Sequence, residues 1–265
     1  MTRGPRLVWS LTLVLLAGAG TGCKETSQWA ECSAIETCAP LQELLKTHPT
    51  HASQQLRAGL TSADPDEQFW SATGLQKTAE AKDIEALRSA LTQGTPPVKA
   101  AIIFTLGERQ ATDARLDLER MLTDSNEDIR AATLVALGKI NSPESGEAVF
   151  RIPPDTDPEL RALQTVLLGL LGYQPSASRA LEQLIDPSPL VRSAALEALV
   201  DLGSPVPFEV LKAVLQDKDW RVRYGGVYAL LELHPKHPEL RSILSKYKAS
   251  ESHPEIQSAL QSIGL

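Results

Sequence analysis

The sequence predicts an all-α solenoid built from stacked two-helix repeats. Two columns of residues recur every 31 positions in one frame, without a gap. The first column is leucine throughout, at Leu75, Leu106, Leu137, Leu168, Leu199 and Leu230. The second is cationic, at Lys99, Arg130, Arg161, Arg192 and Arg223. A fixed period between about 20 and 50 residues is typical of repeat proteins, whose units bury a continuous core only by stacking.

The longer helix of each repeat is predicted to begin at a column of N-capping residues. Positions 64, 95, 126, 157, 188 and 219 are Asp, Thr, Asn, Asp, Ser and Asp, and proline follows four of them. A short side-chain oxygen can accept a free N–H of the first helical turn, and proline fits where no N–H is needed. Glycines near the helix ends are expected to be left-handed caps. They are Gly107, Gly138, Gly169 and Gly203.

A shorter apolar segment with helical spacing precedes each long helix, at 84–91, 116–122, 181–185 and 210–215. In the third repeat, Pro153 and Pro154 are expected to cut this helix off and Gly146 to weaken it, which predicts an irregularity near residues 141–158. The ends leave the frame, as capping repeats do. We expect capping helices at 40–46 and 51–60, and at 238–246 and 253–260.

The turn between the two helices carries an aspartate column and leads into a recurring motif. Examples are Asp124-Ser-Asn-Glu-Asp-Ile-Arg-Ala-Ala-Thr-Leu-Val-Ala-Leu-Gly138 and Asp186-Pro-Ser-Pro-Leu-Val-Arg-Ser-Ala-Ala-Leu-Glu-Ala-Leu199. The pattern resembles the HEAT-like repeats of the phycobilisome-lyase type over about residues 62–233. The resemblance implies a right-handed α-solenoid of stacked two-helix HEAT-like repeats. It also implies that two columns brace each turn and the adjacent repeat: Asp124, Asp155, Asp186 and Asp217, and Arg130, Arg161, Arg192 and Arg223. Gln93 and Lys99 depart from these columns.

The amino terminus reads as a secretory signal. Residues 1–22 combine Arg3 and Arg6 with an apolar run from Leu7 to Ala17, too short for a membrane-spanning helix. The small residues before Cys23 resemble a bacterial lipobox, which implies lipidation of Cys23; ordinary signal cleavage is the alternative. We therefore expect a signal peptide at 1–22, a lipid-anchored segment at 23–39 and one solenoid domain at 40–265. The resemblance places the protein in the bacterial cell envelope, at the outer membrane facing the periplasm, with the lipid as its contact with the membrane.

The remaining two cysteines, Cys32 and Cys38, are predicted to form a disulfide, which would persist in an oxidising periplasm. Free thiols or a metal site are the alternatives. Two thiolates are too few for structural zinc, and Cys-x5-Cys is not the spacing of a catalytic redox pair.

Neither charge nor motifs favour catalysis or nucleic-acid binding. The chain has 26 Lys and Arg against 33 Asp and Glu, a formal charge of −7, whereas nucleic-acid binders need basic surfaces. The sequence lacks phosphate-binding glycine loops and catalytic-triad signatures, and its five histidines fit turn and capping roles better than a metal site. We expect no catalytic residues, no metal and no cofactor, and hence not an enzyme.

The best functional indication is a stripe on the long helices, opposite their core positions. It contains apolar residues where charge is expected, Phe104, Val135 and Val166, and Trp220, Tyr224 and Tyr228 follow at helical spacing in the last full repeat. In HEAT-like solenoids these helices line the concave face, so the resemblance implies a groove for a protein or peptide partner; rings packed against the C-terminal cap are the alternative. The sequence thus favours a monomeric, non-enzymatic scaffold. A structural or self-associating envelope protein and a lyase-like enzyme remain the alternatives.

Overall fold

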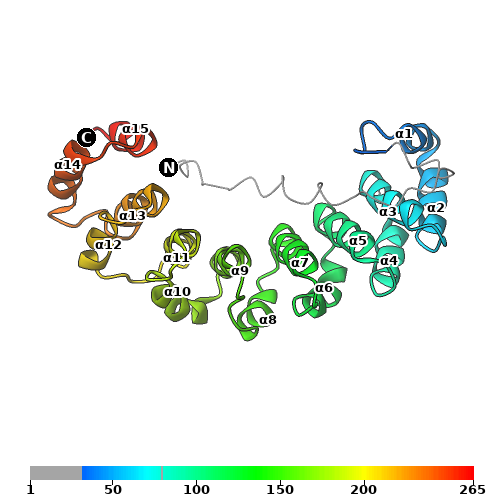
Figure 1. Ribbon diagram of the computed structural model, residues 1–265, viewed down its shortest axis with the longest axis horizontal. Coiled ribbons are helices and arrows are strands. Elements are labelled where there is room, and N and C mark those ends of the chain that lie inside the picture. Colours follow the sequence, from blue (N-terminus) through cyan, green and yellow to red (C-terminus); the bar gives the residue numbers. More distant parts are fainter. Residues whose placement is uncertain (1–31, 79) are drawn as a thin grey trace. The chain divides into compact units, whose positions relative to one another are not determined.

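The computed structural model describes residues 32–78 and 80–265, and within them every regular element is helical. The chain divides into two compact units, one ending at Ser142 and one running from Pro143 to Leu265. The signal peptide expected at residues 1–22 and the lipidation expected at Cys23 lie outside the described residues. Each unit is a stack of two-helix repeats, which confirms the predicted all-α solenoid class (Figure 1).

The N-terminal unit consists of two capping helices followed by repeats. Its elements are α1 (Ala39–Leu45), α2 (Pro49–Gly59), α3 (Pro65–Gly74), the 3-10 helix η2 (Leu75–Lys77), α4 (Ala81–Ala90), α5 (Pro96–Glu108), η3 (Thr112–Ala114), α6 (Arg115–Met121) and α7 (Glu127–Ile140). The long helices α3, α5 and α7 pack side by side in one layer, and the shorter helices α4 and α6 form the other (Figure 1).

The C-terminal unit repeats this two-layer arrangement. Its elements are α8 (Ser145–Arg151), α9 (Pro158–Leu170), η4 (Gln174–Ser176), α10 (Ala177–Gln183), α11 (Pro189–Asp201), α12 (Phe208–Val214), α13 (Trp220–Leu233), α14 (Leu240–Ser250) and α15 (Pro254–Ser262). Helices α9, α11 and α13 pack against one another, and α15 packs on α13 as the terminal cap. We call α3, α5, α7, α9, α11 and α13 the second helices.

The sequence placed the starts of the second helices correctly. All six expected N-caps immediately precede a second helix. The carboxylate of Asp157 accepts the N–H groups of Glu159 and Leu160 at 2.8 and 3.1 Å. Asp64, Asn126 and Asp219 cap their helices in the same way, and each such cap stabilises a helix by about 1 kcal/mol.

The expected left-handed caps were wrong for three glycines. Gly107, Gly138 and Gly169 lie inside α5, α7 and α9, and of the four only Gly203 has a positive φ. The left-handed residue comes three positions later and also recurs every 31 residues, as Gln110, Asn141, Gly172 and Gly203.

Two of these interior glycines permit close helix packing instead. A Cβ on Gly107 would lie 2.8 Å from the Cα of Ala136, and a Cβ on Gly169 would lie 2.6 Å from the Cα of Ala198. Because the obstructing atoms are backbone, the second helices could not pack this closely with any larger residue.

The third repeat is less irregular than expected. Helix α8 ends at Arg151, before the two prolines, and has seven residues, the same length as α6, α10 and α12. Gly146 does not break it, because it lies in the first turn and leaves room for the ring of Tyr173, whose Cβ would be 2.8 Å from an added methyl group.

Candidate functional site

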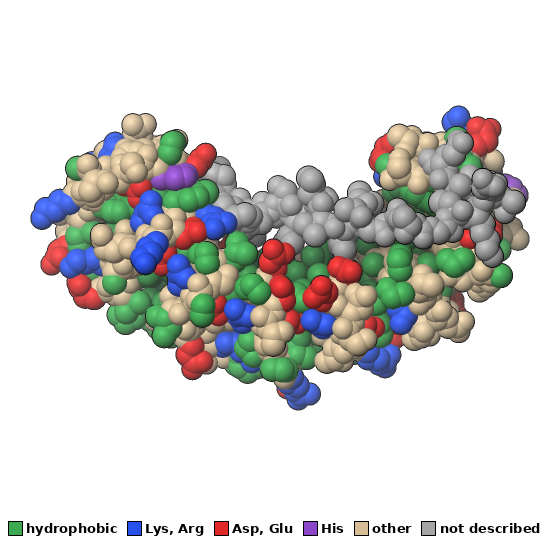
Figure 2. Space-filling view, viewed as in Figure 1, with side chains coloured by type: hydrophobic (Ala, Val, Ile, Leu, Met, Phe, Trp, Pro, Cys, Tyr) green, Lys and Arg blue, Asp and Glu red, His purple; other side chains and the backbone are tan. Residues whose placement is uncertain are grey.

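The predicted stripe lies on the exposed side of the second helices in both units. One residue per helix occupies the equivalent position, and all six are half-buried. They are Thr73, Phe104 and Val135 in the N-terminal unit, and Val166, Glu197 and Tyr228 in the C-terminal unit. We call this row the second-helix stripe. Figure 2 shows hydrophobic and charged side chains interspersed on the face it draws.

In the N-terminal unit a lysine covers part of the stripe. The Nζ atom of Lys139 lies 4.8 Å from the centre of the Phe104 ring and also forms an ion pair with Glu108. Burial lowers the pKa of Lys139. The ammonium group therefore sits over the ring that the sequence suggested as a partner contact, an arrangement that stabilises a partly exposed aromatic residue by about 0.5–1 kcal/mol.

In the C-terminal unit the three aromatic residues of α13 separate into two roles. Trp220 stacks on His253 at the start of α15, with ring centres 4.0 Å apart and planes 8° from parallel. This contact ties Trp220 to the C-terminal cap, as the alternative interpretation of the sequence had it. Tyr224 packs at the edge of the core of this unit, and both Tyr224 and Tyr228 remain half-buried, with part of each ring exposed.

The arginine and aspartate columns form a ladder along one edge of the C-terminal unit. The guanidinium of Arg161 donates to both carboxylate oxygens of Asp186, at 3.0 and 3.2 Å. Arg192 repeats the contact with Asp217 at 2.8 Å for both bonds. The third nitrogen of each arginine donates to carbonyls of its own turn, for example Arg192 to the Asp186 carbonyl at 2.8 Å. Each arginine thus joins its own turn to the turn of the following repeat.

The aspartates of the ladder also shape the turns. Each accepts the backbone N–H two residues ahead, from Asn126, Asp157, Ser188 and Asp219. Burial alone would raise the pKa values of Asp186 and Asp217, but hydrogen bonds from Arg161 and Arg192 and from these N–H groups lower them. In the N-terminal unit, Arg130 donates to the Asp124 carbonyl at 3.1 Å.

The ladder ends on a glutamate from the C-terminal cap. Arg223 forks onto Glu251 at 2.8 and 3.0 Å, and the hydroxyl of Tyr247 donates to the same carboxylate. The bond from Arg223 is the main reason that the pKa of Glu251 falls to about 2. Burial raises the pKa of Tyr247. An open crevice of about 290 Å³ lies beside this group, lined in part by Asp217, but the charged residues around it already bind one another.

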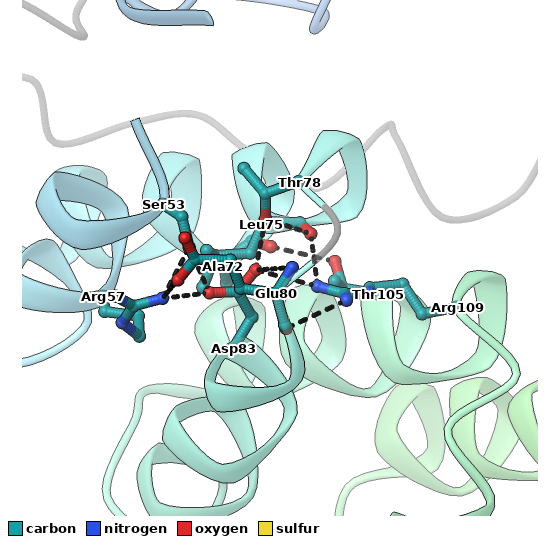
Figure 3. Close-up of polar contacts among 9 residues, drawn as sticks. All are labelled: Ser53, Arg57, Ala72, Leu75, Thr78, Glu80, Asp83, Thr105 and Arg109. Carbon is teal, nitrogen blue, oxygen red and sulfur yellow. Dashed lines mark hydrogen bonds and ion pairs between the residues drawn. The ribbon is translucent and has the colours of Figure 1, made fainter. Parts of the chain in front are cut away.

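Sequence reasoning missed a buried polar cluster in the N-terminal unit (Figure 3). Asp83 in α4 has no exposed surface. Its carboxylate accepts hydrogen bonds from Ser53, from Arg57 at 2.5 Å, from Thr78 at 2.6 Å and from Arg109 at 3.1 Å. Burial would raise the pKa of Asp83, and these four donors together lower it. The cluster connects the capping helix α2 with α4 and with Arg109, the residue that follows α5.

A departure from the repeat could have revealed this cluster. At intervals of 31 residues, Asp83 corresponds to Ala114, Ser145 and Ser176. Arg109 likewise corresponds to Ile140, Leu171, Leu202 and Leu233. This acid and this base both replace small or apolar residues, in the repeat that has Gln93 and Lys99 in place of the usual aspartate and arginine, so they form a matched pair.

The described residues show neither a membrane-spanning helix nor a metal centre. None of their helices is long and apolar enough to cross a bilayer. No group of three or more His, Cys, Asp or Glu side chains within residues 32–78 and 80–265 could hold a metal ion. Cys32 and Cys38 are joined, with Cα atoms 4.5 Å apart, directly before α1.

These features define a repeat protein whose second helices present a partly apolar stripe and whose turns are tied by paired charges. The profile of HEAT repeats matches residues 84–167, 150–231 and 177–264. The chain therefore belongs to the HEAT-repeat family.

Solved structures of three proteins resemble this chain in fold. The CpcE–CpcF complex of phycocyanin lyase from Nostoc sp. is 19% identical, with a TM-score of 0.52, covering 79% of this chain and 92% of that one. YibA of Escherichia coli is 18% identical, with a TM-score of 0.58 and coverage of 85% and 84%. A HEAT-like repeats protein of the archaeon Thermococcus onnurineus is 13% identical, with a TM-score of 0.54 and coverage of 80% and 95%. No curated protein sequence matches the chain.

Proposed function

We propose that this protein is a non-enzymatic scaffold of the bacterial envelope, anchored by lipid on Cys23 and facing the periplasm from the outer membrane. Its second-helix stripe would bind an extended segment of a protein partner. The observation that carries this proposal is that four of the six residues of the second-helix stripe are apolar or aromatic and half-buried: Phe104, Val135, Val166 and Tyr228. Partly exposed aromatic residues are common anchors of protein interfaces.

The arrangement of charge supports binding rather than catalysis. The strongly interacting acids and bases, in the ladder and in the Asp83 cluster, are paired with one another and joined to backbone groups. Such pairing lowers the pKa values of Asp83, Asp186 and Asp217, which keeps these carboxylates ionised and makes them weak bases at neutral pH. The stripe itself presents apolar surface beside scattered acids, which suits an interface.

The decisive experiment is an affinity capture with the mature domain and a matched pair of double variants. Tyr224→Ala with Tyr228→Ala removes the two partly exposed tyrosine rings of α13, one of them in the stripe, whereas Leu181→Ala with Ile185→Ala removes exposed apolar side chains of α10 and the turn after it. We expect a stoichiometric partner that the tyrosine variant loses and the control retains. A partner retained by the tyrosine variant would exclude the stripe as the binding surface.

One observation favours a second candidate, a self-associating envelope protein. The shorter helices of the C-terminal unit and the turn after α10 expose apolar side chains: 37% of Leu181 in α10, 88% of Ile185 in the turn and 40% of Val210 in α12 are accessible. Sedimentation of the mature domain separates the candidates. A concentration-dependent dimer that Leu181→Ala with Ile185→Ala abolishes would support self-association through this surface.

The anchor has its own test. Mass spectrometry of the mature N-terminal peptide should show an acylated Cys23, and Cys23→Ala should move the protein from the membrane fraction to the soluble one, because the acyl chains supply the membrane affinity. An unmodified residue at the mature N-terminus, with the protein still periplasmic, would instead indicate ordinary signal cleavage.

A further inference from the structure

Two second helices of the C-terminal unit end in exposed acids. Helix α11 ends at Asp201, and Glu232 is the penultimate residue of α13. The two residues are 31 positions apart, so they occupy the same place in consecutive repeats, and their helices pack side by side. Both side chains are exposed.

This placement opposes the electrostatics of the helices. The C-terminal end of a helix carries a partial negative charge, and an anion there destabilises it by roughly 0.3–1 kcal/mol. The last turns of α11 and α13 contain no basic residue. Neither Asp201 nor Glu232 has an ion-pair partner within residues 32–78 and 80–265. His234, which follows α13, directs its Nε2 atom to the Val206 carbonyl.

In the N-terminal unit, an acid at the equivalent helix end is paired with a lysine of the same unit. Glu108 is the last residue of α5 and occupies the position equivalent to Asp201 and Glu232. Its carboxylate is paired with Lys139, which lies in the last turn of the next second helix, α7. The fold can therefore supply a cation at this place, and the C-terminal unit does not.

The cations of the C-terminal second helices serve other contacts. Arg161, Arg192 and Arg223 bind carboxylates along the ladder, and Arg221 binds Asp219 at 2.6 Å. The sequences of α9, α11, α13 and α15 contain no lysine. The acids at the ends of α11 and α13 thus face solvent without a compensating positive charge on the same layer.

Aromatic surface adjoins these acids. Tyr224 and Tyr228 precede Glu232 by eight and four residues, which places all three on one side of α13. We infer that this acid–tyrosine face, formed by Asp201, Tyr224, Tyr228 and Glu232, binds a segment of a partner protein rich in Lys and Arg. The Lys and Arg side chains of the segment supply the positive charge that the C-terminal ends of α11 and α13 lack. Their aliphatic stems and guanidinium groups pack on the tyrosine rings. The inference rests on the proposed function and names its partner class.

The test combines binding with stability. The probe is a fluorescein-labelled peptide of repeating Lys-Leu-Ser units, and the comparison peptide carries Glu in place of Lys. We expect the basic peptide to bind at least about ten-fold more tightly, with affinity falling as salt rises. Asp201→Asn with Glu232→Gln should reduce that preference to below about two-fold. The same variant should raise the melting temperature of the free protein by about 1–3 °C per substitution, because the unfavourable charges are removed.

Glu108→Gln is the matched control, because the charge of Glu108 is already paired. It should leave peptide binding unchanged and should not raise the melting temperature. The basic-partner inference would be overturned if the two peptides bound with equal affinity or if neither peptide bound. If the wild-type protein binds both peptides equally and the variant Tyr224→Ala with Tyr228→Ala binds neither, the proposed function stands. If binding survives the tyrosine variant, the proposed function fails as well.

Discussion

Replacing Asp83 offers the sharpest test of how the N-terminal cap is held to the repeats. Asp83→Asn keeps the shape of a fully buried side chain and removes its charge, so Arg57 and Arg109 lose a common anion. Breaking a buried ion pair by removing one partner costs about 3–5 kcal/mol. Here we expect the lower end, about 3 kcal/mol. Both cations keep other acceptors: Glu80 for Arg57 at 2.8 Å, and the Leu75 carbonyl for Arg109 at 3.1 Å.

The repeat itself provides the control for this prediction. The next repeat has Ala114 and Ile140 where this one has Asp83 and Arg109. Asp83→Ala with Arg109→Leu therefore converts the charged arrangement into the small and apolar one that the fold already uses. We expect the double variant to be less destabilised than the sum of the two single variants by at least about 1 kcal/mol, because each single change leaves a buried charge uncompensated.

Urea unfolding followed by far-ultraviolet circular dichroism measures these free energies, with the two units treated as separate transitions where they resolve. The loss should appear in the N-terminal transition. If Asp83→Asn costs less than about 1 kcal/mol, or if the single effects add without coupling, the reasoning that the buried charges depend on one another is wrong.

Three further predictions follow from single contacts. Gly169→Ala should destabilise the C-terminal unit by about 1–3 kcal/mol in urea, because the added methyl group meets the backbone of the neighbouring helix. Glu251→Gln should lower stability by about 3 kcal/mol at neutral pH, because Arg223 lowers the pKa of Glu251 from 4.5 to about 2. That contribution is complete above pH 4.5 and is lost as the pH falls toward 2, so wild-type and variant unfolding curves should converge over this range. The mature, unreduced protein should show no free thiol from Cys32 and Cys38, and reduction should cost about 2 kcal/mol for a loop this short.

Each of these has a clear contrary result. An unchanged urea midpoint for Gly169→Ala would mean that α9 and α11 can move apart with little loss of stability. A constant difference between the Glu251→Gln and wild-type curves from pH 7 to pH 2 would mean that the carboxylate titrates normally in the fold. Detection of two free thiols from Cys32 and Cys38 in the unreduced protein would show that the disulfide does not form.

The repeated part of the fold could be predicted because each repeat has to solve the same local problems. The N-cap Asp157, the proline after it and the core leucines each follow from elementary helix chemistry. Because equivalent residues recur every 31 positions, the pattern can be distinguished from chance at any single position. The error over Gly107 and Gly169 shows the limit of that reasoning. Glycine has two uses, as a left-handed turn residue and as a place of close approach, and only the packing of the neighbouring helix decides between them.

The candidate site was less accessible to sequence reasoning than the fold. The sequence located the stripe, since its periodicity is that of the helix, but it could not show that Trp220 would stack on His253 or that Lys139 would cover Phe104. Both contacts join residues from different repeats or from the cap. Their pairing depends on side-chain directions, which a one-dimensional pattern does not carry.

The two units differ in a way that bears on where a partner binds. In the N-terminal unit the acid at the end of α5 is neutralised by Lys139, and the capping helix is tied down through the buried Asp83. In the C-terminal unit the ladder holds the turns, while Asp201 and Glu232 stay uncompensated at the helix ends. Sequences tend to depart from local rules at functional positions, because a favourable local choice there would compete with the ligand. The N-terminal unit therefore fits a supporting role, and the electrostatic cost left in the C-terminal unit is recovered when a cationic segment binds.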